Sequence, residues 1–157
     1  MDMGKGTTPL DLLRAVDRDR HHRTPLRPTF QKILQKDEAK RNYIRSHDFL
    51  ASCFEFDPVS GRLKWKGYRP RVHFKDSASW RRWETRCAGT QVQNPRTISV
   101  TYRGRNDTLS PSKIAAVLLT ERDYDDIRSV RFCDGDRTNI SRSNLLVSFR
   151  DRGEPSI

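Results

Sequence analysis

The stretch Ser129-Val-Arg-Phe-Cys-Asp-Gly-Asp-Arg-Thr-Asn139, followed by Asn144-Leu-Leu-Val147, decides the fold that we expect for this chain. Its first four residues have the composition of a short strand. Asp134 and Gly135 follow at once and are typical of a tight turn, because aspartate bonds its own backbone and glycine accepts a positive φ. Asn139 and Asn144 are placed to hydrogen-bond the loop backbone and fix its shape. The sequence therefore predicts a strand that enters an ordered loop.

Upstream of this stretch, the hydrophobic pattern predicts two hairpins and a helix. A two-residue alternation marks the strands, and Gly61 and Gly104 stand where each hairpin needs a turn. Pro111 opens the helix, a position at which its missing N–H is not needed. The predicted elements are a strand, turn and strand over 56–65, a hairpin over 97–109, and a helix over 110–119.

The N-terminal part follows a helical pattern instead. Phe30, Ile33 and Leu34 recur at helical intervals after Thr29, and a further helix is predicted from Ser46. Residues 66–88 show no regular period and are predicted to be irregular. We expect an α+β fold with a helical N-terminal portion and small antiparallel hairpins. Its parts are a flexible basic arm (1–28), a helical segment (29–47) and the main domain (48–157).

The composition excludes several classes of protein. No stretch approaches the ~20 apolar residues of a membrane span, so we expect no membrane contact. The cysteines Cys53, Cys87 and Cys133 are widely spaced without a C-x-x-C pair, so neither a disulfide framework nor a zinc finger is expected. No phosphate-binding P-loop, G-x-S-x-G or H-E-x-x-H motif is present. The start of the chain lacks the order of a secretory signal, which favours a reduced, intracellular protein.

The charge of the chain indicates a partner. Lysine and arginine number 31, aspartate and glutamate 20, and the net charge is +11. Residues 50–96 hold ten basic and four acidic residues, so the excess gathers in the middle of the chain. This balance suits a polyanion, because neutralised phosphates release their counterions. The alternative is a solvated surface without a binding role.

Basic and aromatic residues are mixed in the irregular stretch and at the tip of the second hairpin. Such a mixture fits phosphate contact together with base stacking. The alternative for Trp65, Trp80 and Trp83 is a small core, which we favour for at least two of the three. The candidate nucleic-acid contacts are Arg69, Arg71, Lys75, Arg81, Arg82, Arg86, Arg103 and Arg105.

Residues 48–147 resemble the phage-type HNH endonucleases, whose nuclease is a ββα-metal hairpin. Phe56-Asp-Pro-Val-Ser-Gly-Arg-Leu-Lys-Trp65 is similar to the opening of that family, and Ala88-Gly89 to the step before its hairpin. Asp134-Gly-Asp-Arg-Thr-Asn139, with Asn144-Leu145, is similar to the family's Asp-His-Ile-Asp-Gly-Asp-x-x-Asn run. The resemblance implies an HNH-like domain from a bacteriophage, acting in the cytoplasm of a bacterial host.

The resemblance also shows what the chain lacks. The family's metal-binding Asp and general-base His fall on Arg131 and Phe132, and a phenyl ring can neither accept a proton nor bind a metal. The family's helix begins Ala-His-Arg, whereas this chain has Pro111-Ser-Lys113. We therefore assign no catalytic or metal-binding residue, and give Asp134, Gly135, Asn139 and Asn144 a structural role.

These expectations combine into a catalytically inactive HNH-like protein without a cofactor. It would bind DNA, RNA or a nucleic-acid-associated host machine through its basic surface. One alternative is a metal-dependent nicking or homing endonuclease in which Asp125, Asp126, Asp134 and Asp136 gather Mg²⁺. Another is a phage inhibitor of a host protein.

Overall fold

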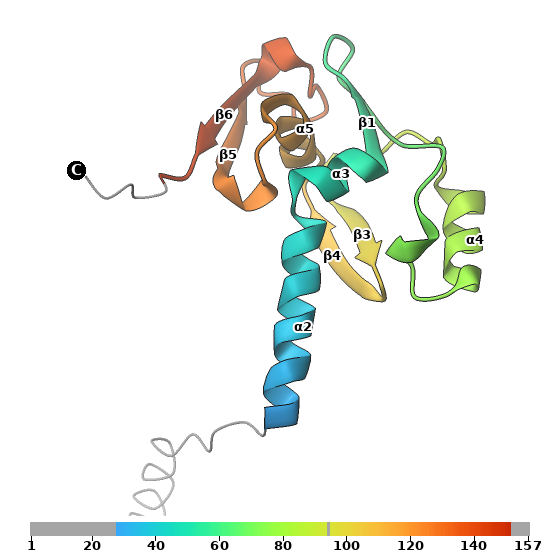
Figure 1. The fold of residues 1–157 in the computed structure, drawn as a ribbon. Helices are drawn as coiled ribbons and strands as arrows, with labels where there is room; N and C mark the ends of the chain where they lie inside the picture. Colours follow the sequence, from blue (N-terminus) through green and yellow to red (C-terminus); the bar gives the residue numbers. More distant parts are fainter. Residues whose placement is uncertain (1–27, 94, 152–157) are drawn as a thin grey trace, which may run out of the picture. The chain divides into compact units, whose positions relative to one another are not determined.

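The computed structural model describes residues 28–93 and 95–151 (Figure 1). The chain divides into two units, residues 1–35 and residues 36–157. The predicted arm over residues 1–28 lies outside the described residues except for its last position.

Four α-helices are described, and local capping explains where three of them begin. Ser46 precedes the second helix, and its hydroxyl accepts a hydrogen bond from the Phe49 amide at 3.2 Å. Asp76 caps the third helix through the Ser79 amide at 2.7 Å. Pro111 occupies the first turn of the fourth. The helices are α2 (Pro28–Ile44), α3 (His47–Cys53), α4 (Ser77–Arg86) and α5 (Pro111–Thr120).

Six strands form three separate antiparallel hairpins, so the predicted α+β class is confirmed. The turn of the second hairpin is Arg103-Gly104, and both residues have positive φ, as the twist of a tight hairpin requires. In the third hairpin, Phe132 pairs with Leu145 and a bulge interrupts the register between Ile127 and Ser129. The strands are β1 (Phe54–Asp57), β2 (Arg62–Trp65), β3 (Ile98–Tyr102), β4 (Arg105–Leu109), β5 (Ile127–Phe132) and β6 (Leu145–Phe149).

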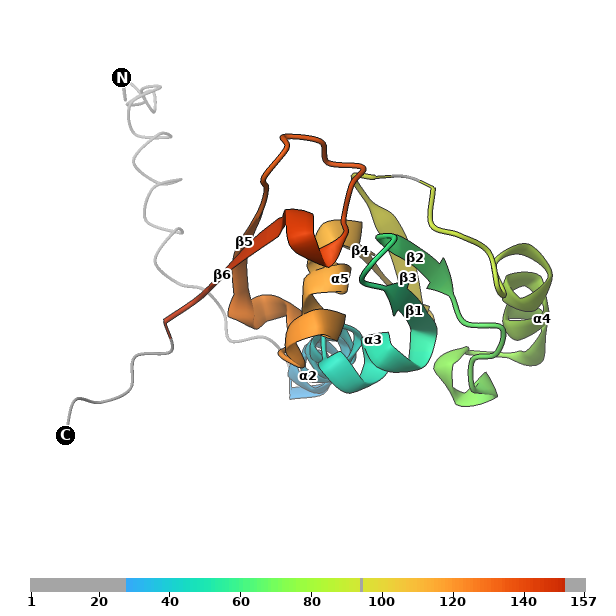
Figure 2. The same cartoon turned by 90° about the horizontal axis from the view of Figure 1, so that it is seen from above.

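The hydrophobic core joins α3 and α5 to the hairpins. Phe49, Leu50, Ile114 and Val117 are fully buried in one cluster that also includes residues of β1 to β5. Figure 2 shows α5 between the β5–β6 hairpin on one side and the β1–β2 and β3–β4 hairpins on the other, with α4 at the far end. The fold therefore separates the surface around α4 from the surface around β5.

Helix α4 corrects the prediction that residues 66–88 are irregular. Trp80 and Trp83 are the only large apolar residues of this helix, and its other positions hold Ala78 and polar or charged residues. Trp65 and Trp83 are buried and Trp80 is half-buried, as expected for a small core. Burial of the indoles therefore stabilises a helix whose periodicity is too weak to predict.

The β1–β2 turn packs against the loop between β5 and β6. Gly61 has a φ of +71°, and a Cβ at this position would lie 2.6 Å from the Ser141 backbone nitrogen. The Arg142 amide donates to the Pro58 carbonyl at 2.8 Å across the same contact. The close contact between these two segments, which are far apart in the sequence, therefore requires a glycine at position 61.

Among the described residues, no helix has the length and apolar character that crossing a bilayer requires.

Candidate functional site

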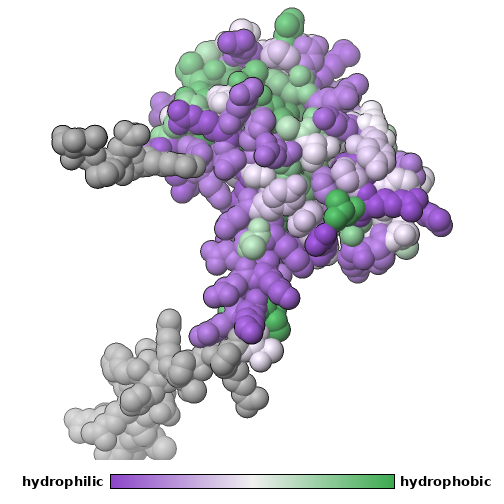
Figure 3. All heavy atoms as spheres, viewed as in Figure 1, coloured by the Kyte–Doolittle hydropathy of each residue, from purple (hydrophilic) through white to green (hydrophobic). Residues whose placement is uncertain are grey.

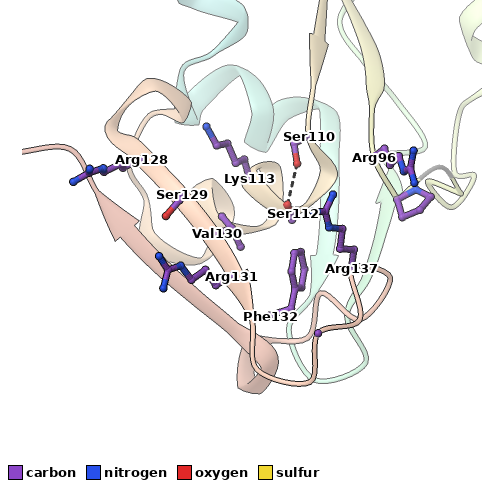
Figure 4. Close-up of a pocket in the computed structure, with 12 residues that line it drawn as sticks. Arg96, Ser110, Ser112, Lys113, Arg128, Ser129, Val130, Arg131, Phe132 and Arg137 are labelled. Carbon is purple, nitrogen blue, oxygen red and sulfur yellow. Dashed lines mark hydrogen bonds between the residues drawn. The ribbon is translucent and has the colours of Figure 1, made fainter.

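A cleft of about 760 Å³ opens between β5 and the start of α5 (Figure 4). Its cations come from four segments of the chain, and no aspartate or glutamate is among the described residues that line it. Ser110, Ser112 and Ser129 add hydroxyl groups, and the first two are hydrogen-bonded to each other at 2.9 Å. We call this the β5 cleft; its cations are Arg96, Lys113, Arg128, Arg131 and Arg137.

Phe132 lies in the β5 cleft, and Figure 4 shows its ring extending from β5 towards Ser112 at the start of α5. It is half-buried and packs against the hydrophobic core. Arg131, the preceding residue, is exposed and faces Leu146 in the strand register. At the two positions where the resemblance places a metal ligand and a general base, the cleft therefore presents a cation and a hydrocarbon ring.

Three polar residues hold the loop that follows β5. Asp134 accepts hydrogen bonds from the side-chain amides of Asn139 and Asn144, both at 2.9 Å, and from the Asp136 amide at 2.8 Å. These bonds, Asn139 first, lower the pKa of Asp134. Asn144 also accepts from the Asp134 amide at 2.9 Å and donates to the Asn139 carbonyl at 2.7 Å. Gly135 completes the turn with a φ of +74°.

The acidic residues of the enzyme alternative have other partners in the described structure. The Asp134 carboxylate accepts the three hydrogen bonds of the loop described above. The Asp136 carboxylate accepts hydrogen bonds from the backbone amide and the hydroxyl of Thr138, at 2.9 and 2.6 Å. Asp125 is ion-paired with Arg45 at 2.7 Å. No group of three or more potential metal ligands occurs within residues 28–93 and 95–151.

Half of the predicted contact residues line a second cleft, between α4 and the β3–β4 hairpin. This cleft has a volume of about 550 Å³, and no carboxylate is among the described residues that line it. Lys75, Arg82 and Arg86 are exposed at its mouth, and Trp65 and Trp83 form part of its wall. We call this the α4 cleft; its cations are Arg69, Lys75, Arg82 and Arg86.

Arg69 differs from the prediction, because it is not an exposed contact residue. Only 1% of its surface is accessible. Its Nη2 donates to the Thr101 carbonyl at 2.8 Å. Its guanidinium carbon lies 4.7 to 5.6 Å from the centroids of four aromatic rings, those of Phe49, Trp65, Phe74 and Trp83. Arg69 is thus a core residue at the base of the α4 cleft.

The other four predicted contact residues lie outside both clefts. Arg71 covers the Trp80 ring at 4.5 Å, and Arg81 is exposed on α4. Arg103 lies at the hairpin tip, where its Nε donates to the Val72 carbonyl at 3.1 Å. Arg105 pairs with Asp37 at 3.6 Å. Arg71, Arg103 and Arg105 thus have separate local contacts, and none of the four cations lines either cleft.

Sequence reasoning missed the cations of the β5 cleft. Arg96, Arg128 and Arg137 belong to no local cluster of basic residues, and Arg131 was assigned only as a lost catalytic position. The one signal available was Lys113, at the helix start where the family has a histidine. Burial, followed by the nearby charge of Arg150, lowers the pKa of Lys113, while the charge of Asp125 acts in the opposite direction.

Comparison with known proteins identifies no relative of this chain. No family model, no curated protein and no solved structure matches the chain. The resemblance to HNH endonucleases stays a prediction that rests on the residues quoted above.

Hydrophilic residues cover most of the face shown in Figure 3, with hydrophobic residues gathered mainly in its upper part. The chemistry available to the described site is that of a polar, cationic surface. It offers ammonium and guanidinium groups, hydroxyl groups and a few accessible rings, which together suit a phosphate-bearing ligand.

Proposed function

We propose that this protein binds nucleic acid without cleaving it, and that the β5 cleft is the main contact. The observation that carries the proposal is the lining of this cleft, which includes five cations and no acidic residue among the described residues. Charges of one sign on the walls of a cleft reinforce one another's field and raise the local concentration of a polyanion. The net charge of +11 acts in the same direction at longer range.

The neighbouring groups favour contact with the backbone over contact with bases. Arginine guanidinium groups pair with phosphate oxygens in bidentate fashion, and serine hydroxyls donate to the same atoms. Such contacts fix position but carry little sequence information. We therefore expect affinity for many sequences, with a strong dependence on salt.

Phe132 supports the non-cleaving part of the proposal. Hydrolysis of a phosphodiester needs a group that takes a proton from the attacking water, and metal ions that stabilise the charge of the transition state. The phenyl ring supplies neither function at the position where the resemblance places the base. The cations beside it retain their affinity for phosphate, because that affinity is independent of proton transfer.

The binding test is fluorescence anisotropy of labelled DNA and RNA over a series of salt concentrations. The triple substitution Arg128→Gln, Arg131→Gln and Arg137→Gln should weaken binding at least about tenfold at low salt. It should also reduce the slope of log K against log salt by about two to three. Arg142→Gln is the matched control, because Arg142 is exposed and lines neither cleft. An unchanged slope in the triple variant, or an equal loss in the control, contradicts the proposal.

Cleavage is tested separately with supercoiled plasmid and Mg²⁺ or Mn²⁺. We expect no nicking at micromolar protein. Nicking that disappears in Asp134→Ala or Asp136→Ala would return the protein to the class of metal-dependent endonucleases. Binding lost together with nicking in these variants would indicate instead that the loop itself has unfolded.

A further inference from the structure

Arg69 is a buried cation that lacks an anionic partner among the described residues. Its guanidinium group makes one side-chain hydrogen bond to a backbone carbonyl, that of Thr101. Its Nε is buried and has no hydrogen-bond acceptor. None of the described ion pairs includes Arg69, although the residue is almost completely inaccessible.

The groups around Arg69 do not neutralise its charge. Burial lowers its pKa, but a guanidinium group stays protonated in proteins. Two thiols lie close enough to interact with it, and burial raises the pKa of Cys53 to about 11 and also raises that of Cys87. Both thiols are therefore neutral near pH 7. The four aromatic faces offset part of the lost hydration, but they carry no net charge.

The cleft above Arg69 adds three further cations. Lys75, Arg82 and Arg86 are exposed at its mouth, and no described lining residue is acidic. Asp76 interacts electrostatically with Lys75 and Arg82, but its carboxylate caps α4 and is not among the lining residues. Hydrogen-bond donors also line the cleft, on Ser79, Ser99, Thr101 and Asn106.

We propose that the α4 cleft is a binding site for a phosphate group, whose negative charge supplies the counter-ion that Arg69 lacks. The exposed cations and the lining hydroxyls contact the phosphate oxygens. Arg69 acts from below through its field, which water screens little inside the protein. Four positive charges, with no acidic residue in the described lining, favour a doubly charged phosphate monoester over a singly charged diester. The volume of about 550 Å³ lies within the range of sites for small molecules.

A phosphate monoester has two sources, the terminal phosphate of a nucleic-acid strand and a free phosphorylated small molecule. In the first case the inference deepens the proposed function and rests on it. In the second case it is independent of that function. The ligand chemistry is the same in both, so the site is tested first with inorganic phosphate.

The tryptophans provide the readout. Trp65 and Trp83 line the α4 cleft with the Arg69 guanidinium between 5.3 and 5.5 Å from their ring centroids. Titration of the full chain with inorganic phosphate, at an ionic strength held constant with chloride, should give a saturable change in tryptophan fluorescence and a rise in Tm. No response beyond that of chloride overturns the proposal.

Two variants assign the response to this cleft. Arg69→Met keeps a long side chain without charge and should weaken phosphate binding at least about tenfold. The double variant Arg82→Gln with Arg86→Gln should weaken phosphate binding to the same extent while leaving the buried core intact. It therefore tests the proposal even if Arg69→Met fails to fold. Arg81→Gln is the matched control, because Arg81 is exposed on the same helix and lines neither cleft. An unchanged phosphate response in the double variant overturns the proposal.

Oligonucleotides of one sequence, with a 5′-phosphate or a 5′-hydroxyl, then identify the source. At least fivefold tighter binding of the phosphorylated strand, lost in the Arg82 and Arg86 variant, assigns the site to strand ends. Equal binding of both strands, with saturable binding of ribose 5-phosphate, assigns it to a free phosphorylated compound. The triple variant of the β5 cleft separates the two proposals, because it should lose nucleic acid and keep the response to inorganic phosphate.

Discussion

The α4 cleft and the β5 cleft are lined by the same kinds of side chain but are built in different ways. All cations of the α4 cleft come from residues 69–86, whereas those of the β5 cleft come from four separate segments. The α4 cleft has a buried arginine and two buried indoles in its wall. In the β5 cleft, Arg128, Arg131 and Arg137 are exposed and the one aromatic ring is half-buried. One cleft is thus an extension of the hydrophobic core, and the other is a surface assembled from loops and strand edges.

This difference separates what each cleft contributes. Trp65, Arg69 and Trp83 affect stability and binding together, because they fill the core and also line the α4 cleft. Substitution of the exposed cations of the β5 cleft, Arg128, Arg131 and Arg137, should change the affinity for a ligand with little effect on folding. Stability measurements therefore distinguish the two regions without knowledge of the ligand.

The largest contrast is expected from removal of an aromatic ring on each side. Trp83→Ala should reduce the free energy of unfolding by about 3–5 kcal/mol, since it deletes a buried indole packed on Trp65, Phe74 and Arg69. Phe132→Ala should cost less than about half as much, because its ring is half-buried at the cleft. Urea denaturation followed by circular dichroism measures both. Equal losses would show that the β5 cleft belongs to the core as fully as the α4 cleft.

A pH dependence of stability should arise on the α4 side. Burial, followed by the charge of Arg69, lowers the pKa of His73 to about 4. The unfolded chain takes up a proton near pH 6.5, whereas the folded chain does so only near pH 4. The contribution of His73 is therefore fully present above pH 6.5. It is lost as the pH falls from 6.5 to 4, by about 3 kcal/mol.

The control for this pH effect is His73→Phe. It preserves ring contacts with Phe49 and Tyr102 and removes the titrating group. The free energy of unfolding, measured in urea at several pH values between 4 and 7, should fall less steeply with decreasing pH in the variant. Parallel curves for the two proteins would show that His73 is accessible to protons in the folded state.

A smaller loss is expected where the β1–β2 turn supports the β5 side. Gly61→Ala should cost about 2–3 kcal/mol, because a Cβ at positive φ is strained and would lie 2.6 Å from the Ser141 nitrogen. Gly89 provides a matched control, since its φ is +72° but nothing lies within 4 Å of an added Cβ. Gly89→Ala should cost about 1 kcal/mol, the strain alone. Thermal melts of the two variants compare these costs. Equal decreases in Tm would show that the β1–β2 turn does not pack closely against the loop between β5 and β6.

The smallest change in stability is expected for a cation that lies outside both clefts. Arg105→Gln should change the free energy of unfolding by at most about 0.5 kcal/mol, because its pair with Asp37 is 3.6 Å long and both side chains are substantially exposed. It should also leave the phosphate response of the α4 cleft unchanged. A loss above about 1 kcal/mol in a thermal melt would place Arg105 among the structural cations with Arg69.

The comparison of sequence with structure differs from element to element. The hairpin over β3 and β4 was predictable, because the alternating residues 97–102 precede a turn that contains Gly104. Helix α5 was predictable from Pro111 and its apolar run. Helix α4 was not, although Asp76 and the spacing of Trp80 and Trp83 were available as a start signal and an apolar side. Two indoles in a short basic segment give too weak a period.

Some features of the candidate sites were likewise predictable from the sequence and others were not. The cations of the α4 cleft were found because they lie close together in the sequence. The burial of Arg69 was not foreseen, because it depends on Phe49, Phe74 and other rings distant in the chain. The loop after β5 follows the pattern of Asp134, Asn139 and Asn144, whose hydrogen bonds join residues at most ten positions apart.

The sequence alone determined the first two hairpins, helices α3 and α5, the polar loop after β5 and the excess of positive charge. Each of these depends on contacts between residues that are near neighbours in the chain or on composition itself. Only the tertiary structure decided which arginine is buried and which arginines meet in the β5 cleft. Those outcomes depend on how distant segments pack, and burial and the summation of charge are properties of positions in space rather than of residue types.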